Sequence, residues 1–347
     1  MNKWFFSILM FFLVSSCSDD NQTFQGETRI GWDDFVSKNI EGRVLSFDEI
    51  IEKPYQLMIK DSILITLNSN ADSICHVFNL NTMKKIGEAI SVGQGPHEML
   101  HASFVFENSD SIKLYDMMKS NIYSYSLEGL LSNQPPSSII KLSESYMFSE
   151  LAALKNGYAC SSYRPDFPCY LFDKSGKKTA EGLGNYPVCS EEYTDLEVID
   201  AYRAVLIGNN LNRVAVCHYF TDLIDIYDFD KGLVKRLHGP EHFYTRFNEF
   251  SEGNRIGSFP DKAYYRDAFY SPINAGECFF VLFNGKFVTD PEYNLMAKDI
   301  LTFNWDGNPL MHYRLNIGVE SITVVPEKRK IYGISQNPEY QIVEYSY

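Results

Sequence analysis

Three closely spaced polar residues form the first group in this sequence that could do chemistry. His97, Glu98 and His101 lie in a segment rich in glycine and proline. Imidazole nitrogens and a carboxylate can bind a divalent cation or exchange protons near neutral pH. We expect this segment, however, to be a connection whose glycines allow tight backbone packing. The three residues are therefore candidate binding residues, and the sequence predicts no metal site.

A second group of candidate residues lies in long connections. Residues 185–202 and 240–266 exceed their neighbours in length, and long loops on a rigid scaffold often carry function. The second segment is rich in aromatic residues and arginine, as ligand and partner surfaces are. The same residues would also serve to pack the insertion onto the domain, and both interpretations stay open. The candidates are His242, Tyr244, Arg246, Tyr264, Tyr265 and Arg266, with Arg164 and Asp166 at an expected hairpin tip.

The sequence contains no familiar catalytic motif. Gly-x-Ser-x-Gly, His-Glu-x-x-His and an EF-hand loop are all missing, and residues 93–96 lack the Lys-Ser/Thr ending of a phosphate loop. A glycosidase needs two carboxylates across the scissile bond, and 45 acidic residues do not single out such a pair. We therefore predict no catalytic residue and no cofactor, and we expect binding rather than catalysis.

Six cysteines follow Cys17, dispersed and without a Cys-x-x-Cys pair. This spacing argues against a zinc site and against a disulfide-rich scaffold. Cys160 and Cys169 flank the turn at Arg164, at equal distances from its centre. Two strands meeting there would place them opposite each other, so a cross-strand disulfide and two buried thiols are the alternatives.

Residues 1–17 predict export. Lys3 precedes the apolar residues 4–13, which are too few to cross a bilayer as a helix, and small residues lead to Cys17. The cysteine resembles that of the bacterial lipoprotein signal, which implies removal of residues 1–16 and a lipid on Cys17 that anchors the chain to a membrane. An ordinary signal peptide is the alternative. The acidic residues 18–21 resemble the signal that sends Bacteroidota lipoproteins to the outer surface of the outer membrane; a periplasmic-facing location is the alternative.

Composition indicates a large folded β domain. Aromatic residues make up 15% of the chain, with 23 Tyr and 25 Phe, and the net charge of −14 argues against nucleic acid. Short runs rich in Ile, Val, Tyr and Phe end at Asn, Asp or Gly, which is typical of strands and hairpin turns. They group in fours, beginning near residues 55, 102, 149, 204 and 267, with a last group of three from residue 321. Four strands repeated every 40 to 50 residues are typical of propeller blades.

The last group lacks one strand, and residues 43–47 form a β run with no group of its own. Pairing the two would close the ring and remove an exposed edge. We therefore predict an all-β fold: a six-bladed β-propeller of four-stranded blades, residues 43–347, whose last blade is closed by an N-terminal strand. Residues 17–42 are expected to be a lipidated N-terminus and polar tether. Seven blades or a β-sandwich are the alternatives.

A family resemblance rests on residues 92–98, Val-Gly-Gln-Gly-Pro-His-Glu, and on residues 300–309, 332–334 and 344–345. These stretches resemble the TolB-like six-bladed propeller lipoproteins of Bacteroidota. His97 departs from the small residue usual after the proline. The resemblance implies the fold and the envelope location and no particular reaction.

These observations favour a monomeric binding or interaction module at the cell envelope. The expected partners are the membrane, through the lipid, and a glycan, a peptide or an outer-membrane protein. A hydrolase or lyase that acts on carbohydrate or peptide in the central pocket is the alternative.

Overall fold

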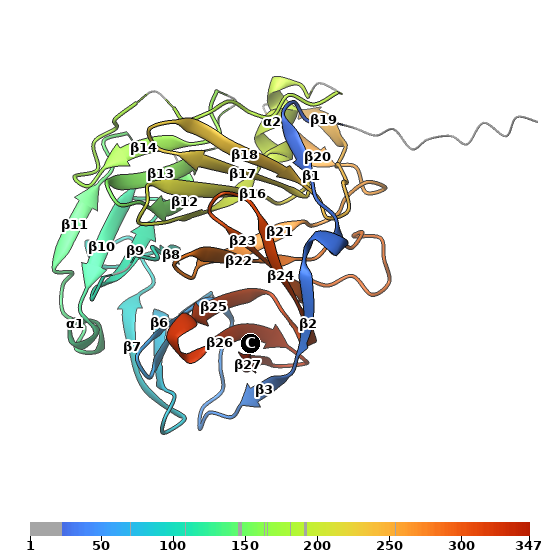
Figure 1. Ribbon diagram of the computed structural model, residues 1–347. Helices are drawn as coiled ribbons and strands as arrows, with labels where there is room; N and C mark the ends of the chain where they lie inside the picture. Colours follow the sequence, from blue (N-terminus) through green and yellow to red (C-terminus); the bar gives the residue numbers. More distant parts are fainter. Residues whose placement is uncertain are drawn as a thin grey trace, which may run out of the picture.

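The computed structural model describes residues 23–347 except 70, 108, 145–147, 163, 165, 181, 191–192 and 254. Six β-sheets follow one another around a ring (Figure 1). In Figure 1 the colours run from the blue first blade through green and gold to the red last blade, which lies beside the first. The predicted six-bladed propeller is thereby confirmed. None of the helices in the described part of the chain is long and apolar enough to cross a membrane.

Consecutive antiparallel strands form the first three blades. Blade 1 contains β4 (Pro54–Lys60), β5 (Ile63–Asn68), β6 (Ser73–Asn79) and β7 (Lys84–Ser91). Blade 2 contains β8 (Ala102–Phe104), β9 (Ile112–Asp116), β10 (Asn121–Tyr125) and β11 (Ser138–Lys141), with α1 (Leu127–Leu131) before its last strand. Blade 3 contains β12 (Phe148–Ala153), β13 (Gly157–Ser162) and β14 (Tyr170–Asp173). Its expected fourth strand, residues 178–183, pairs with the sheet only through two isolated bridges.

The last three blades include strands from the N-terminal region. Blade 4 contains β15 (Ala204–Gly208), β16 (Arg213–His218), β17 (Leu223–Asp228), β18 (Gly232–His238) and β1 (Glu27–Arg29). Blade 5 contains β21 (Phe269–Asn274), β22 (Cys278–Phe283), β23 (Ala297–Asn304), β24 (Pro309–Val319) and β2 (Val36–Ile40). Blade 6 contains β25 (Ser321–Val325), β26 (Lys330–Gln336), β27 (Tyr340–Ser346) and β3 (Gly42–Leu45). Val44 of β3 lies opposite Val343 of β27, so the predicted closure by an N-terminal strand is confirmed.

The expected polar tether is wrong for residues 24–40. β1 pairs in parallel with β18, and β2 pairs in parallel with β24, on either side of a short 3-10 helix, η1 (Trp32–Asp34). Four apolar residues, Phe24, Ile30, Phe35 and Ile40, are buried and hold this segment against the propeller. Because β1 has only three residues and most of β2 is exposed, neither strand shows the apolar run by which the other strands are recognised. We call residues 24–40 the strap; Cys17 and the signal peptide lie outside the described residues.

The hydrophobic core lies between the blades. Successive side chains of a strand point to opposite faces of its sheet, and here each face meets a neighbouring blade. In β22, for example, Phe279 and Val281 pack against blade 4, and Phe280 and Leu282 pack against blade 6. Among the described residues, every neighbouring pair of blades shares such a buried cluster, the pair formed by blades 6 and 1 included.

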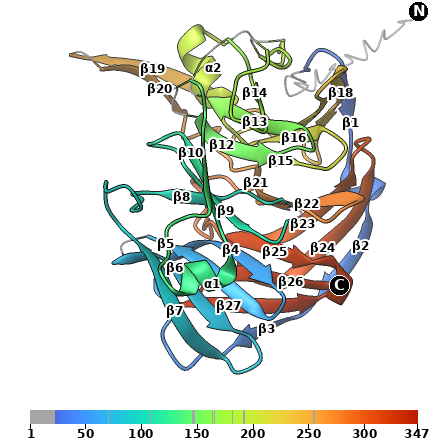
Figure 2. The ribbon, with the colours of Figure 1, turned by 90° about the vertical axis from the view of Figure 1, so that its left-hand side faces the viewer.

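The two long insertions pack together on one end of the propeller. The first contains α2 (Asp195–Ala201), and the second forms a hairpin of β19 (Phe247–Glu252) and β20 (Arg255–Pro260). Figure 2 shows this hairpin projecting away from the blades beside α2. The hydroxyl of Ser258 on β20 donates to the Asp200 carboxylate at 2.8 Å, which ties the hairpin to the helix.

Candidate functional site

The innermost strands of all six blades line a central cavity of about 720 Å³. These strands are β4, β8, β12, β15, β21 and β25, the first strand of each blade. From β12 through β15, β21, β25 and β4 to β8, each of them contacts the next. Lys53 and Asn294 in connecting segments and Tyr340 at the start of β27 also contribute to its wall. A volume of this size suits a small-molecule or oligomeric ligand rather than a single ion.

Aromatic side chains from several blades form much of the cavity wall. They are Tyr55, Phe104, Phe106, Tyr219, Tyr270 and Tyr340. Tyr55 is fixed in place because its hydroxyl donates to the carbonyl of Ala102 on the next blade at 2.7 Å. Tyr270 is fixed in the same way by the carbonyl of Leu295 at 2.8 Å. Rigid aromatic walls of this kind bind the apolar faces of sugars, side chains and ring systems.

Three acidic side chains also line the cavity: Glu150, Asp267 and Glu320. Burial raises the pKa of Glu150 from 4.5 to about 7. Burial also raises the pKa of Glu320, although the nearby Lys53 ammonium opposes the shift. Burial raises the pKa of Asp267 too, against hydrogen bonds from the hydroxyls of Tyr293 and Tyr265. At neutral pH the Glu150 carboxyl can therefore both donate and accept a hydrogen bond.

Ser271 shows that the cavity wall carries backbone strain. It has a φ of 50°, which a residue with a side chain rarely adopts, and it lies where β21 and β22 lose register between Tyr270 and Ile273. Its hydroxyl accepts a hydrogen bond at 2.9 Å from the backbone N–H of Ile322 in blade 6. The bulge thus joins blades 5 and 6 at the cavity, where strained positions are often functional.

The loop with His97, Glu98 and His101 lies outside this cavity. The Glu98 carboxylate accepts a hydrogen bond from the Gly95 N–H at 2.8 Å, and the Lys119 ammonium donates to the Gly95 and Glu98 carbonyls, both at 2.7 Å. A Cβ on Gly93 would overlap the Glu98 carboxylate, so a larger residue there would displace this side chain from its hydrogen bond with Gly95. His97 and Glu98 border a separate hollow of about 400 Å³ beside β7, whereas His101 stacks on Tyr55 with ring centroids 5.0 Å apart.

The arginine and aromatic residues of the second insertion largely contact one another. Arg266 lies between the rings of Phe243 and Phe287, at 4.1 and 4.7 Å from their centroids, and pairs with Glu241. Similar contacts hold the other candidates: Arg246 lies over the Tyr264 ring, Tyr244 stacks on Tyr193, and Tyr265 packs edge-on against Phe220. His242 is exposed, and its backbone N–H donates to the buried Asp222 carboxylate. These contacts favour a packing role for the insertion.

Arg164 and Asp166 lie on the surface, 4.0 Å apart, and the Tyr170 hydroxyl donates to Asp166 at 2.5 Å. Of the two alternatives for Cys160 and Cys169, the structure has the pair of buried thiols, and both cysteines are free. Cys160 lies opposite Tyr170, one residue away from the expected register. The two cysteines therefore face different blades, Cys160 toward blade 2 and Cys169 toward blade 4.

The cavity acids were missed by sequence reasoning. Each lies in or next to the first strand of a blade: Glu150 in β12, Asp267 just before β21, and Glu320 just before β25. Their shared position in the repeat was a usable signal, because the first strand of a blade lines the central channel. In the described part of the chain, the one trio of His and acidic side chains close enough to share a cation is Glu52, His76 and Glu88, outside the cavity.

A ring of six blades around a central cavity defines a six-bladed β-propeller. The TolB-like 6-blade propeller-like family matches residues 34–327. The chain belongs to this family.

Two solved structures share the fold. A putative exported protein from Bacteroides fragilis is 11% identical, with a TM-score of 0.52, over 90% of this chain and 98% of that chain. A member of the DUF4221 family from Bacteroides vulgatus is 10% identical, with a TM-score of 0.53, over 94% of this chain and 97% of that chain. At these identities the likeness shows the fold alone. No curated protein matches the chain.

Proposed function

We propose that this protein is an exported, lipid-anchored propeller that binds a glycan or a peptide in its central cavity. The observation that carries the proposal is the cavity itself, about 720 Å³ lined by all six blades. Its aromatic walls match sugar faces and apolar side chains, and the Glu150 carboxyl, whose pKa is about 7, matches hydroxyl and amide groups. The fold is consistent with an interaction module, since propellers hold their ligands on a rigid ring.

The envelope location is part of the same proposal. It is supported by residues 1–17, which have the layout of a lipoprotein signal, and by the likeness to a protein described as exported. Membrane and outer-membrane protein partners, surface exposure and a monomeric state belong to this proposal as well. Fractionation of cells, with protease added to intact and to broken cells, tests both the membrane association and the side on which the domain lies.

The binding proposal is tested with an array of glycans and a library of short peptides, followed by calorimetry on each hit. Phe106→Ala removes an aromatic wall residue, and Glu150→Gln removes a titratable group at nearly constant shape. Both variants are expected to weaken binding of a hit at least about tenfold. Glu339→Gln, at an exposed position, is the matched control and is expected to bind like the wild type. Equal binding by all variants would place the ligand outside the cavity.

The pKa of Glu150 near 7 is a specific observation in favour of the enzymatic alternative. A carboxyl with that pKa can act as a general acid at neutral pH. If the protein is a hydrolase or lyase, a bound glycan or peptide is converted to product at a rate that Glu150→Gln abolishes. Stable binding without product over many hours contradicts this alternative and leaves the binding proposal intact.

A further inference from the structure

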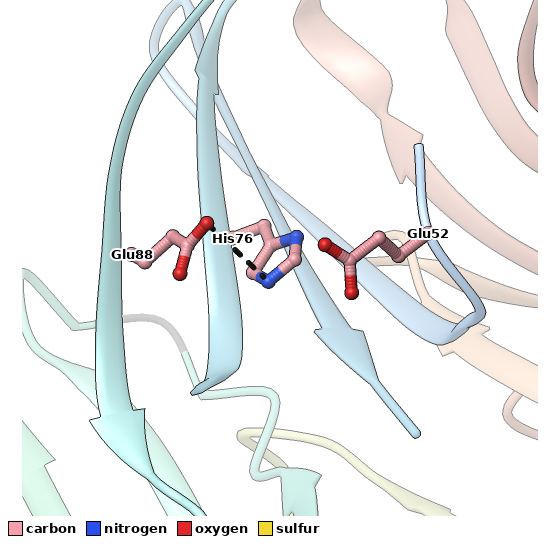
Figure 3. Close-up of side chains that lie close together, drawn as sticks. All are labelled: Glu52, His76 and Glu88. Atoms are coloured by element: carbon pink, nitrogen blue, oxygen red, sulfur yellow. Dashed lines mark ion pairs between the residues drawn. The ribbon is translucent and has the colours of Figure 1, made fainter. Parts of the chain in front are cut away.

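A buried histidine in blade 1 lies between two carboxylates. His76 on β6 is 1% exposed, and Figure 3 shows Glu88 of β7 on one side of its ring and Glu52, which precedes β4, on the other. The Nε2 atom of His76 lies 4.0 Å from a Glu88 carboxylate oxygen. One ligand atom from each of the three side chains lies within 4.8 Å of the other two. His76 and Glu88 are cross-strand partners on the adjacent strands β6 and β7, and Glu52 reaches them from the segment before β4, at the other side of the blade.

One nitrogen of the His76 ring also lacks a hydrogen-bond partner. Its Nδ1 atom is buried and has none among the described residues. A buried polar atom without a partner costs free energy, so such atoms are rare unless an ion or a water occupies the site. Burial and the Lys85 ammonium lower the pKa of His76, against the carboxylates of Glu52, Glu88 and Glu49, and the neutral imidazole is the form that binds a cation.

The charges around His76 suit a divalent cation. Lys85 pairs with Glu88 and lies 3.7 Å from Glu49. The carboxylates of Glu49, Glu52 and Glu88 against one ammonium leave about two negative charges for a cation to neutralise. When Glu88 turns to the metal, Lys85 can pair with the Glu49 carboxylate instead, so metal binding does not leave the Lys85 ammonium unpaired.

We propose that Glu52, His76 and Glu88 form a binding site for a divalent transition-metal ion, with zinc as its preferred occupant. One imidazole and two carboxylates are ligands that zinc takes, and water fills the remaining position. Calcium and magnesium, which prefer oxygen alone, fit less well.

The position of the site gives the metal a structural consequence. Glu52 belongs to the short link between β3, the last strand of blade 6, and β4, the first strand of blade 1. His76 and Glu88 belong to the outer half of blade 1. A bound ion therefore fastens the link at the ring closure to the blade beside it, and metal binding adds directly to the stability of the folded state.

The test uses the purified full chain, stripped of metal with a chelator and then titrated with Zn²⁺ by calorimetry. We expect one ion per chain and a rise of the melting temperature by about 3 °C or more at saturating zinc. His76→Gln and Glu52→Gln are each expected to weaken zinc binding at least about tenfold. Glu52 is exposed, so Glu52→Gln keeps the test informative if His76→Gln does not fold.

His97→Gln is the matched control, because His97 is an exposed loop histidine outside the cluster. It is expected to bind zinc like the wild type. Substitution with Co²⁺ supplies a spectroscopic readout, since a nitrogen and oxygen site of low coordination number gives visible absorption that Glu52→Gln would remove. Zinc binding that is equal in the wild type, His76→Gln and Glu52→Gln overturns the proposal, as does no binding of Zn²⁺ at about 100 μM.

Discussion

Arg236 and Asp225 form a bidentate ion pair inside blade 4, on the side where the strap enters. The Nε and Nη2 atoms of Arg236 lie 2.8 and 2.9 Å from the two carboxylate oxygens, and both side chains are buried. The Nη1 atom donates to the Gln25 carbonyl at 2.9 Å. The pair therefore holds the first described residues against the propeller through a buried contact.

Arg236→Met leaves the Asp225 carboxylate buried without its cation, and we expect a loss of about 3–5 kcal/mol in the free energy of unfolding. Urea unfolding followed by circular dichroism measures this. The double variant Arg236→Met with Asp225→Leu removes both charges and is expected to recover most of the loss. A single variant as stable as the wild type would show that the pair does not hold blade 4.

The pH dependence of stability reports on His238 and Glu27, which are joined by a contact of 2.9 Å between Nδ1 and a carboxylate oxygen. Burial alone would lower the pKa of His238, but Asp222 and Glu27 raise it above 6.5. The contribution of His238 to the free energy of unfolding is therefore complete below pH 6.5 and is lost as pH rises through the folded pKa. Burial opposes the shift of Glu27, but hydrogen bonds, first that from Arg29, lower its pKa below 4.5. Its contribution is complete above pH 4.5 and is lost as pH falls through the folded pKa.

The strap is thus held most firmly between pH 4.5 and 6.5. Unfolding free energies measured from pH 4 to 9 should fall on the alkaline side in the wild type. In His238→Gln the free energy of unfolding should decline less on the alkaline side, because the part of the decline that comes from His238 is removed. Identical pH profiles would contradict the coupling.

Glu150→Gln is expected to stabilise the protein in alkaline solution. The pKa of Glu150 is raised by burial from 4.5 to about 7, so ionisation opposes folding increasingly as pH rises through this range. We expect a gain of about 1–2 kcal/mol above pH 7, reduced from the full shift because the side chain borders a cavity, and no gain at pH 4. Glu339→Gln should leave stability unchanged at both pH values, and a gain that does not depend on pH would contradict burial as the cause.

Two substitutions in the closing strand β3, one buried and one exposed, test whether this strand stabilises the closed ring. Leu45 of β3 is buried between blades 6 and 1, and Leu45→Ala should cost about 2–4 kcal/mol. Its neighbour Val44 is 40% exposed, so Val44→Ala should cost less than about 1 kcal/mol. Deletion of residues 43–47 should lower the melting temperature further. An unchanged melting temperature after the deletion would mean that β3 does not close the ring.

Cys17→Ala tests the anchor. The variant should move from the membrane fraction to the soluble fraction, because the lipid has no other attachment point in the predicted signal. Blotting of separated fractions measures the distribution, with Cys278→Ala, a cysteine far from the signal, as the control. If the Cys17→Ala chain stayed in the membrane fraction, the proposed lipid anchor at Cys17 would be contradicted.

Sequence patterns predicted the fold in detail because blades repeat. The turn glycines Gly176 and Gly307 have φ values of 84° and 76°, the left-handed conformation that the expected hairpins need. The strap escaped notice because its few buried residues, such as Phe35, are separated by exposed polar ones. The register at Cys160 differs by one residue from the expected one, since Cys160 pairs with Tyr170 and not with Cys169.

The cavity acids and the His76 cluster depend on which strand ends meet in space. Strands β4, β5 and β6 lie between Glu52 and the strand that carries Glu88. No spacing along the sequence therefore indicates that the two side chains lie close together. For the second insertion the sequence left binding and packing open, because arginine and aromatic residues serve both; the Arg266 guanidinium lies between two rings of its own fold, which favours packing.

The strap gives the folded chain a mechanical property. A pull on the chain ahead of residue 23 loads first the bridge between Phe24 and Cys189, then the pairing of β1 with β18, and then the five-residue parallel pairing of β2 with β24. Only after both pairings have separated does the load reach β3, whose loss opens the ring. The pairings of β1 with β18 and of β2 with β24 therefore bear any tension along the N-terminal segment. The closing strand β3 carries no load until both pairings have separated.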